Sequence, residues 1–231
     1  MSTLRVALFD LDGTLIDTEG QYSVFWGMIG RRYHPEIPRF EHIIKGSTLT
    51  RIFDNYFPDP AVQAEINPQL EAFEDQMQYR FYPGAVQFIS DLRAHGVRCA
   101  VVTSSNQLKM ASVYKQLPEL RTLFDRILTS EDFSASKPHP DCYLKGAAAF
   151  GADLSECVVF EDAINGLQAG MSSGIYTIGI ATGLTPAQIA DRCHHVILSY
   201  DGLTYEGVNE LINSGLFKDL FPGVSSQTLL P

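Results

Sequence analysis

The chain has 231 residues, of which 45% are hydrophobic, and its formal net charge is −10. This length is enough for one α/β domain with a small second one. The acidic balance argues against nucleic acid or an anionic membrane as a partner, because phosphates are met by clusters of Lys and Arg. No apolar stretch reaches the ~18 residues of a membrane span, and no secretory signal pattern begins the chain. The four cysteines form no CxxC pair and fit reduced thiols, so we expect a cytoplasmic protein.

The first predicted element is an apolar strand, Leu4–Phe9, which ends abruptly at Asp10, with Asp12 and a Gly-Thr pair close behind it. The stretch that follows, from residue 17 to residue 80, contains no clear strand. Its aromatic and aliphatic residues recur at helical spacing in 19–33, 47–57 and 64–81. We interpret these aromatic residues as the core of a small helical bundle rather than as a cofactor box, because a stripe at this spacing is usually core.

From residue 82 onward, helices and short apolar strands alternate along the chain. Helical patterns cover 82–96, 106–117, 141–151, 163–174 and 202–215, and strand patterns fall within 97–105, 124–133, 157–162, 175–180 and 194–198. This alternation predicts parallel βαβ units in a doubly wound α/β sheet. The helical stretch then becomes an insertion after the first strand.

Polar side chains follow several of these predicted strands, at the edge of the sheet where a parallel α/β fold binds its ligand. They are Asp10 and Asp12, Thr103 to Ser105, the loop Ser136-Lys137-Pro138, and Glu161 with Asp162. Carboxylates brought together need a cation, and oxygen ligands without His or Cys favour Mg²⁺ over zinc. Lys137 and the hydroxyl groups would hold an anion beside the metal. The alternative is that each acid only caps a helix or a turn, which suits one acid better than the whole set.

Four motifs resemble those of the haloacid dehalogenase-like (HAD) hydrolases. The stretch "DLDGTLIDT" is similar to the family's first motif, DxDGT(L/V)xD(S/T); the other three are "CAVVTSS", "SKPHPDCY" and "VVFEDAINGLQAG". The insertion falls where this family carries its small helical C1 cap. The resemblance therefore implies a HAD-like Rossmannoid core formed by residues 1–16 and 82–231, with residues 17–81 as the cap.

The resemblance also implies a role for each motif residue. Asp10 would be the nucleophile that forms an aspartyl-phosphate, and Asp12 the general acid and base. Thr103 and Ser104 would bind the transferring phosphoryl group, and Lys137 would neutralise it together with Asp10.

Mg²⁺ would be held by Asp10, Asp12 and Asp162, with Glu161 as a further ligand or directly behind one. These assignments make the protein an Mg²⁺-dependent phosphatase, and we expect a monomer.

In the insertion, a polar loop with a glycine separates two apolar helical patterns. Such a loop suits a lid over a site, so we expect Lys45, Ser47 and Thr48 to face the substrate. The substrate would be a small phosphorylated metabolite such as a sugar phosphate, because a closed lid leaves limited room.

Two other functions remain open at this point. One is a phosphosugar mutase similar to β-phosphoglucomutase, and the other is a non-catalytic protein that binds a sugar phosphate. Mutases of that kind resemble DTxxYHxxAW after the first motif and KGxSR in the cap. Here Tyr22 stands in place of the His, and Leu49 in place of the Arg, although Arg51 could substitute from the next turn. We therefore favour hydrolysis, and the complete set of motif residues argues against a non-catalytic protein.

Overall fold

A parallel sheet of six strands organises the fold, in the order β3-β2-β1-β4-β5-β6. The computed structural model describes residues 3–214. Its strands are β1 (Val6–Phe9), β2 (Arg98–Val102), β3 (Arg126–Leu128), β4 (Cys157–Glu161), β5 (Tyr176–Ile180) and β6 (His195–Ile197). β1 lies at the centre and is buried on both faces, as the apolar run predicts. The strand order reverses beside β1, and ligands of doubly wound sheets bind at such a switch point.

Helices cover both faces of this sheet. One face packs on α5 (Ala85–Ala94), α6 (Gln107–Gln116), α7 (Leu120–Leu123) and α11 (Tyr205–Ser214), and the other on α8 (Asp141–Ala148) and α9 (Ile164–Ser173). Alternate residues of β1 supply the two cores, with Phe9 on the first face and Leu8 on the second. The predicted α/β fold with a doubly wound parallel sheet is confirmed.

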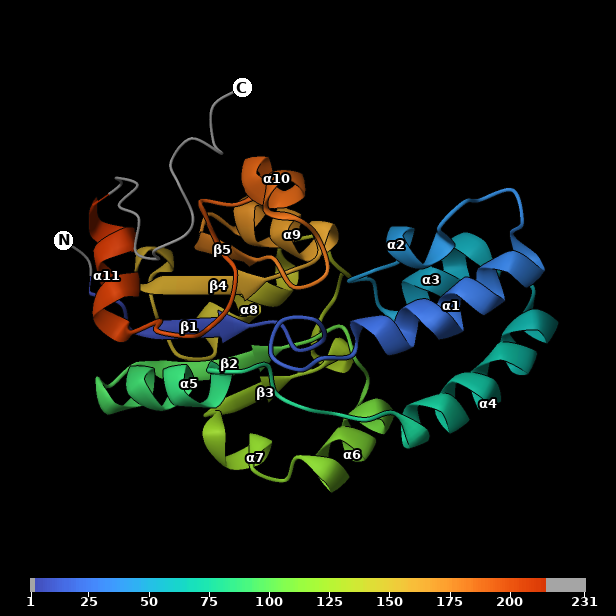
Figure 1. The fold of residues 1–231 in the computed structure, drawn as a ribbon, viewed down its shortest axis with the longest axis horizontal. Helices are drawn as coiled ribbons and strands as arrows, with labels where there is room; N and C mark the ends of the chain where they lie inside the picture. Colours follow the sequence, from blue (N-terminus) through green and yellow to red (C-terminus); the bar gives the residue numbers. More distant parts are fainter. Residues whose placement is uncertain (1–2, 215–231) are drawn as a thin grey trace.

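The insertion (residues 17–81) consists of α1 (Glu19–Tyr33), α2 (Phe40–Ile43), α3 (Leu49–Tyr56) and α4 (Pro60–Gln76). These helices lie beyond the carboxyl ends of the strands, on the right of Figure 1. They enclose a separate hydrophobic cluster that contains Phe25, Trp26, Phe53 and Phe57, so the aromatic residues are core, as predicted. The exact boundaries between core and cap domains stay a prediction.

Helix boundaries differ from the predicted ones where local chemistry decides them. α4 begins at Pro60, four residues earlier than the pattern indicates, because the Asp59 side chain accepts a hydrogen bond from the Ala61 N–H and Pro60 suits a first helical position. Residues 77–81 are not helical, and Phe81 forms a bridge to Ile16. The short helices α2, α7 and α10 (Pro186–Ile189) were not predicted, since one turn is too short to display a period.

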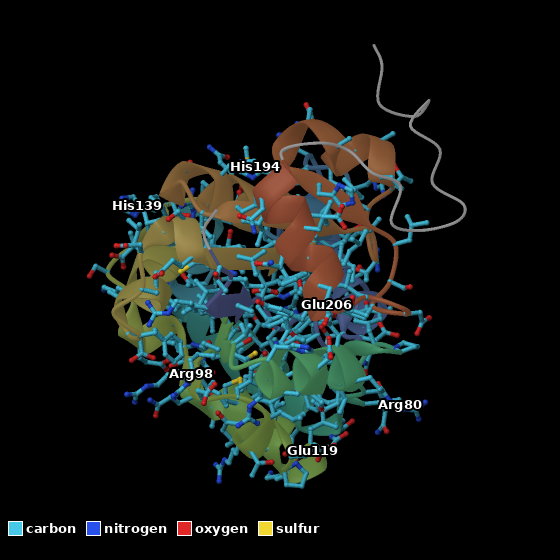
Figure 2. The ribbon with its side chains drawn as sticks, turned by 90° about the vertical axis from the view of Figure 1, so that its left-hand side faces the viewer. Arg80, Arg98, Glu119, His139, His194 and Glu206 are labelled. Atoms are coloured by element: carbon cyan, nitrogen blue, oxygen red, sulfur yellow. The ribbon has the colours of Figure 1, made fainter. Side chains whose placement is uncertain are left out.

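Figure 2 shows the side of the molecule that lies farthest from the insertion, with α11 in front and Glu206 labelled on it. Arg98, the first residue of β2, is on the same side, at the amino ends of the strands. Among residues 3–214, no helix combines the length and apolarity of a membrane span.

Candidate active site

The carboxyl ends of β1 and β4 bring three buried carboxylates together. Asp10 follows β1, Glu161 ends β4, and Asp162 comes next; each offers an oxygen within 4.8 Å of the others. The register of the strands fixes this meeting, since Phe9 pairs with Phe160 and the Asp10 N–H donates to the Phe160 carbonyl at 3.0 Å. Leu11 is fully buried between Asp10 and Asp12, and both acids line one cavity.

Lys137 places a buried ammonium group beside these acids. Its Nζ donates to Asp10 Oδ1 at 2.6 Å and to Glu161 Oε1 at 2.7 Å, and the side chain is 1% exposed. Burial alone would lower the pKa of Lys137, but the attraction of the two carboxylates outweighs it and raises the pKa, so the group stays charged. Burial raises the pKa of Asp10, and Lys137 opposes that rise by stabilising the carboxylate.

Glu161 uses both of its oxygens to hold other groups. Oε1 also accepts from the Tyr143 hydroxyl at 2.9 Å, and Oε2 accepts from the N–H groups of Asp162 and Ala163 at 2.9 and 3.0 Å. The absence of a side chain at Gly166 makes room for it, since a Cβ there would lie 1.7 Å from Glu161 Oε1. Of the two roles predicted for Glu161, this arrangement suits a group that positions Lys137 and Asp162 better than a metal ligand.

Asp162 is arranged differently, and both of its oxygens have close partners. Oδ1 accepts from the Thr14 hydroxyl at 2.8 Å. Oδ2 is buried and pairs with the Lys45 ammonium, 2.6 Å away. The donor set of Asp10 and Asp162, which offers carboxylate oxygens and no His or Cys, fits a hard divalent cation such as Mg²⁺.

Asp12 points away from this cluster and is held by three side chains. Its Oδ1 accepts from the Thr18 hydroxyl at 2.8 Å, and Oδ2 accepts from the Ser105 hydroxyl at 2.8 Å and from the Lys109 ammonium. Burial would raise the pKa of Asp12, but Lys109 and the hydrogen bonds outweigh it and lower the pKa. Any contact of Asp12 with a metal would therefore use its backbone carbonyl.

The predicted phosphoryl-binding residues follow β2, directly beside Asp10. Thr103 is buried at the cavity, and its hydroxyl accepts from the Ser105 N–H at 3.0 Å. The Ser104 hydroxyl instead donates to the carbonyl of Gly46 in the insertion at 3.0 Å. Thr103 is thus positioned for an anion, whereas Ser104 also links core and insertion.

Three core side chains hold the loop of residues 45–48, which we name the latch loop. Besides Ser104, Asn165 Nδ2 donates to the Lys45 carbonyl at 2.9 Å, and Ser136 Oγ accepts from the Thr48 N–H at 3.1 Å. Each of the three comes from a different motif of the core. The latch loop is thereby held against the strand ends.

The latch-loop residues predicted to face the substrate do not all lie on the cavity. Lys45 and Ser47 line it together with Asp10. The Thr48 hydroxyl accepts from the Arg51 N–H and so caps α3, and Thr48 lines a neighbouring groove that also contains Arg51. Thr48 therefore contacts the core through its main-chain N–H, whereas its hydroxyl caps α3.

A cavity of about 130 Å³ lies between the strand ends and the insertion. Its core side includes Asp10, Asp12, Thr103 and Lys109, and its insertion side includes Tyr22, Trp26, Glu41, Lys45, Leu70 and Glu74. The sequence did not single out Lys109, Glu74 or Tyr143. No local signal marks them, because each sits in an ordinary helical pattern and becomes special only through burial.

Comparison with known proteins identifies the family. A model described as haloacid dehalogenase-like hydrolase matches residues 4–174. Glycerol-1-phosphate phosphohydrolase 2 of Saccharomyces cerevisiae is 32% identical over 89% of this chain and 86% of its own length. Hexitol phosphatase A of Escherichia coli is 32% identical over 75% of this chain and 81% of its own length. The chain therefore belongs to the haloacid dehalogenase-like hydrolases, as its motifs indicated, and is a phosphatase-type enzyme of that family.

The chain is also similar to part of a longer protein and, in its fold, to solved structures. The chain spans 21% of SUPPRESSOR OF QUENCHING 1, a chloroplastic protein of Arabidopsis thaliana, with 26% identity over 92% of this chain. A HAD family IA hydrolase from Entamoeba histolytica superposes with a TM-score of 0.78, 23% identity, and coverage of 90% of this chain and 99% of its own. β-Phosphoglucomutase from Clostridium difficile gives a TM-score of 0.76, 19% identity, and coverage of 92% and 98%. At these identities the superpositions show a shared fold and nothing about substrate.

Proposed function

We propose that this protein is an Mg²⁺-dependent phosphomonoester hydrolase that acts on a small phosphorylated metabolite through an aspartyl-phosphate on Asp10. The observation that carries the proposal is the pairing of the buried Lys137 with Asp10, which lines the cavity and lies close to Asp162. A carboxylate that neighbours an ammonium group can approach a phosphoryl group without unscreened repulsion.

The proposed reaction has two halves. In the first, a carboxylate oxygen of Asp10 bonds to phosphorus while the bond from phosphorus to the leaving oxygen breaks, and that oxygen takes a proton from Asp12. In the second, water attacks the phosphoryl group, Asp12 removes its proton, and inorganic phosphate and free Asp10 result. The Lys109 ammonium favours the ionised form of Asp12 that this second half needs.

Other residues hold the group that is transferred. Lys137 and Thr103 would bind phosphoryl oxygens, and Glu161 would keep Lys137 in place. Asp10, Asp162 and the backbone of Asp12 would hold Mg²⁺, which when bound supplies positive charge beside those oxygens.

For the substrate class we propose sugar or polyol monophosphates. Support comes from two relatives at 32% identity, which are named for glycerol 1-phosphate and hexitol phosphates. The small cavity and the acidic chain argue against phosphoproteins and nucleic acids. We also propose that residues 17–81 form a cap domain on a core of residues 1–16 and 82–231, in a monomer. The four free cysteines agree with a cytoplasmic location.

The deciding experiment is phosphate release from p-nitrophenyl phosphate with Mg²⁺ and with EDTA. EDTA should abolish release, and Mg²⁺ in excess should restore it. Asp10→Asn, which is nearly isosteric, should abolish release while the circular dichroism spectrum stays that of the wild type. A wild-type rate in Asp10→Asn would refute the covalent mechanism, and a protein inactive on every monoester would favour the non-catalytic alternative.

A further inference from the structure

The chemistry of the cavity beyond the phosphoryl site depends on which charges face the leaving group. On the insertion side, the ionisable groups that line the cavity are Glu41, Glu74, Lys45 and the hydroxyl of Tyr22. Lys45 directs its ammonium toward Asp162, 2.6 Å away, at the phosphoryl end of the cavity. No arginine lies among the described residues that line this cavity.

The core contributes one further cation near the leaving group, and a carboxylate already holds it. Lys109 donates to Asp12 and is 5% exposed. Its ammonium also lies 4.6 Å above the centre of the Tyr22 ring. A second anion on the substrate would have to compete with Asp12 for this group.

Glu74 is the carboxylate that is most firmly built into the wall. It is 8% exposed, and its Oε1 accepts from the Tyr22 hydroxyl at 2.7 Å. The Tyr79 hydroxyl donates to the Glu74 carbonyl at 2.8 Å, which fixes the end of α4. Burial raises the pKa of Glu74, against the effect of Lys109 and of the hydrogen bond from Tyr22. A carboxylate held in this way can accept a hydrogen bond from a hydroxyl and repels another anion.

Apolar side chains also line the insertion side of the cavity, and the space is small. Trp26, Ile52 and Leu70 line the insertion side beside Glu74. The volume of about 130 Å³ is close to that of an apolar cavity of about 150 Å³ that holds benzene. A leaving group with a short carbon chain and a few hydroxyls satisfies both the apolar contacts and the carboxylates.

We propose that Glu74, supported by Tyr22, is a specificity-determining residue that selects monophosphates of short, uncharged polyols and rejects leaving groups with a second anion. This inference rests on the proposed phosphatase function and narrows its substrate class. Glu41, the other carboxylate that lines the insertion side, acts in the same direction.

The test compares glycerol 1-phosphate with 3-phosphoglycerate, which carries a carboxylate in place of a hydroxymethyl group, and uses p-nitrophenyl phosphate as a reference. The wild type should have a kcat/KM for glycerol 1-phosphate at least about tenfold above that for 3-phosphoglycerate. Glu74→Gln should reduce this preference about tenfold, since it removes the charge but keeps the shape. Glu74→Asp, which keeps the charge, should retain the preference. Glu71→Gln, on the exposed face of the same helix, is the matched control and should leave it unchanged.

The outcomes separate the inference about Glu74 from the proposed phosphatase function. A wild-type preference for 3-phosphoglycerate would overturn the inference while leaving the phosphatase function intact. If Glu74→Gln does not fold, Glu41→Gln replaces it and should reduce the preference in the same direction. An unchanged preference in the folded carboxylate variants would also overturn the inference. No release from any of the three esters would overturn the proposed function, and the inference with it.

Discussion

Lys109 lies buried between Asp12 and the ring of Tyr22, which is a costly place for an ammonium group unless it is paired. Lys109→Met should therefore leave the Asp12 carboxylate without its charged partner. We expect a loss of about 3 kcal/mol in the free energy of unfolding, the lower end for a broken buried pair, because Asp12 keeps two hydroxyl donors. The rate should fall mainly through kcat, since Asp12 acts in the chemical steps.

Urea denaturation and steady-state kinetics measure these two effects. The control is Lys115→Met, on the same helix, where the ammonium pairs with Asp75 at 2.8 Å on the surface and is 68% exposed. That pair should contribute little to stability, because water and salt screen exposed charges. Equal losses in the two variants would contradict a special role for Lys109.

At the residue scale, the sequence predicted the parts of the site that lie in contiguous motifs. Asp10, Asp12, Lys137 and Asp162 each follow a strand or stand in a motif loop, so their spacing was informative. Glu74 was not predicted, because a glutamate in an amphipathic helix is normally solvated. Its burial against Tyr22 arises from the packing of α4 on α1, which no local pattern encodes.

At the element scale, the latch loop joins the insertion to three motifs of the core. The double variant Ser136→Ala/Asn165→Ala removes two of the three core side chains that hydrogen-bond its main chain. Because a typical hydrogen bond contributes about 1 kcal/mol, we expect KM to rise about tenfold or more, with a smaller change in kcat. Hydrogen exchange at the Thr48 amide should quicken in the free protein. Ser90→Ala, on the exposed face of α5, is the control, and a KM equal to that of the wild type in the double variant would argue against the latch.

The contact between α11 and the end of α5 includes His95, whose charge depends on pH. His95 stacks on Tyr205 with ring centres 4.5 Å apart, and its Nε2 lies 3.0 Å from Glu206 Oε1. A hydrogen bond to the Asp91 carbonyl, together with Glu206, raises the pKa of His95. A raised folded-state pKa stabilises the protein fully below the unfolded value, near 6.5, and this contribution is lost as the pH rises through the folded-state pKa.

His95→Asn should therefore lower Tm more at pH 6 than at pH 9. Thermal unfolding at the two pH values measures the difference, and the loss of ring stacking contributes equally to both. A Tm difference that is the same at pH 6 and pH 9 would show that the charge of His95 does not stabilise this contact.

The same scale shows where prediction of elements succeeds. Strands β1, β2, β4 and β5 were located because each is an apolar run that is buried on both faces. The start of α4 was missed because a capping aspartate and a proline set it, and the apolar pattern begins later. Periodicity reports burial, whereas caps and single turns depend on local hydrogen bonds.

At the scale of the whole molecule, the doubly wound sheet and the insertion supply different parts of the site. The sheet supplies Asp10 and Asp162 at the ends of β1 and β4, the loop before α8 supplies Lys137, and the insertion supplies the wall that faces the leaving group. A parallel, doubly wound sheet could be expected from alternating strands and helices. The contact between the insertion and the core could not, because it depends on side chains such as Ser104 and Asn165 that meet the main chain of a distant loop.

This division leads to the expectation that the enzyme hydrolyses rather than isomerises. A phosphosugar mutase has to hold two phosphates at once, and the second needs a cation on the insertion wall. Arg51 lines the groove beside Thr48 rather than the cavity, and Glu41 and Glu74 face the place where a second phosphate would lie. Mixed with β-glucose 1-phosphate, a trace of glucose 1,6-bisphosphate and Mg²⁺, the protein should turn over any sugar phosphate that it accepts into free sugar and inorganic phosphate in equal amounts. The amount of glucose 6-phosphate, measured by a coupled oxidation, should stay at the level found with the Asp10→Asn variant. Its rapid formation without phosphate release would show that the insertion does bind a second phosphate, and would replace the hydrolase with a mutase.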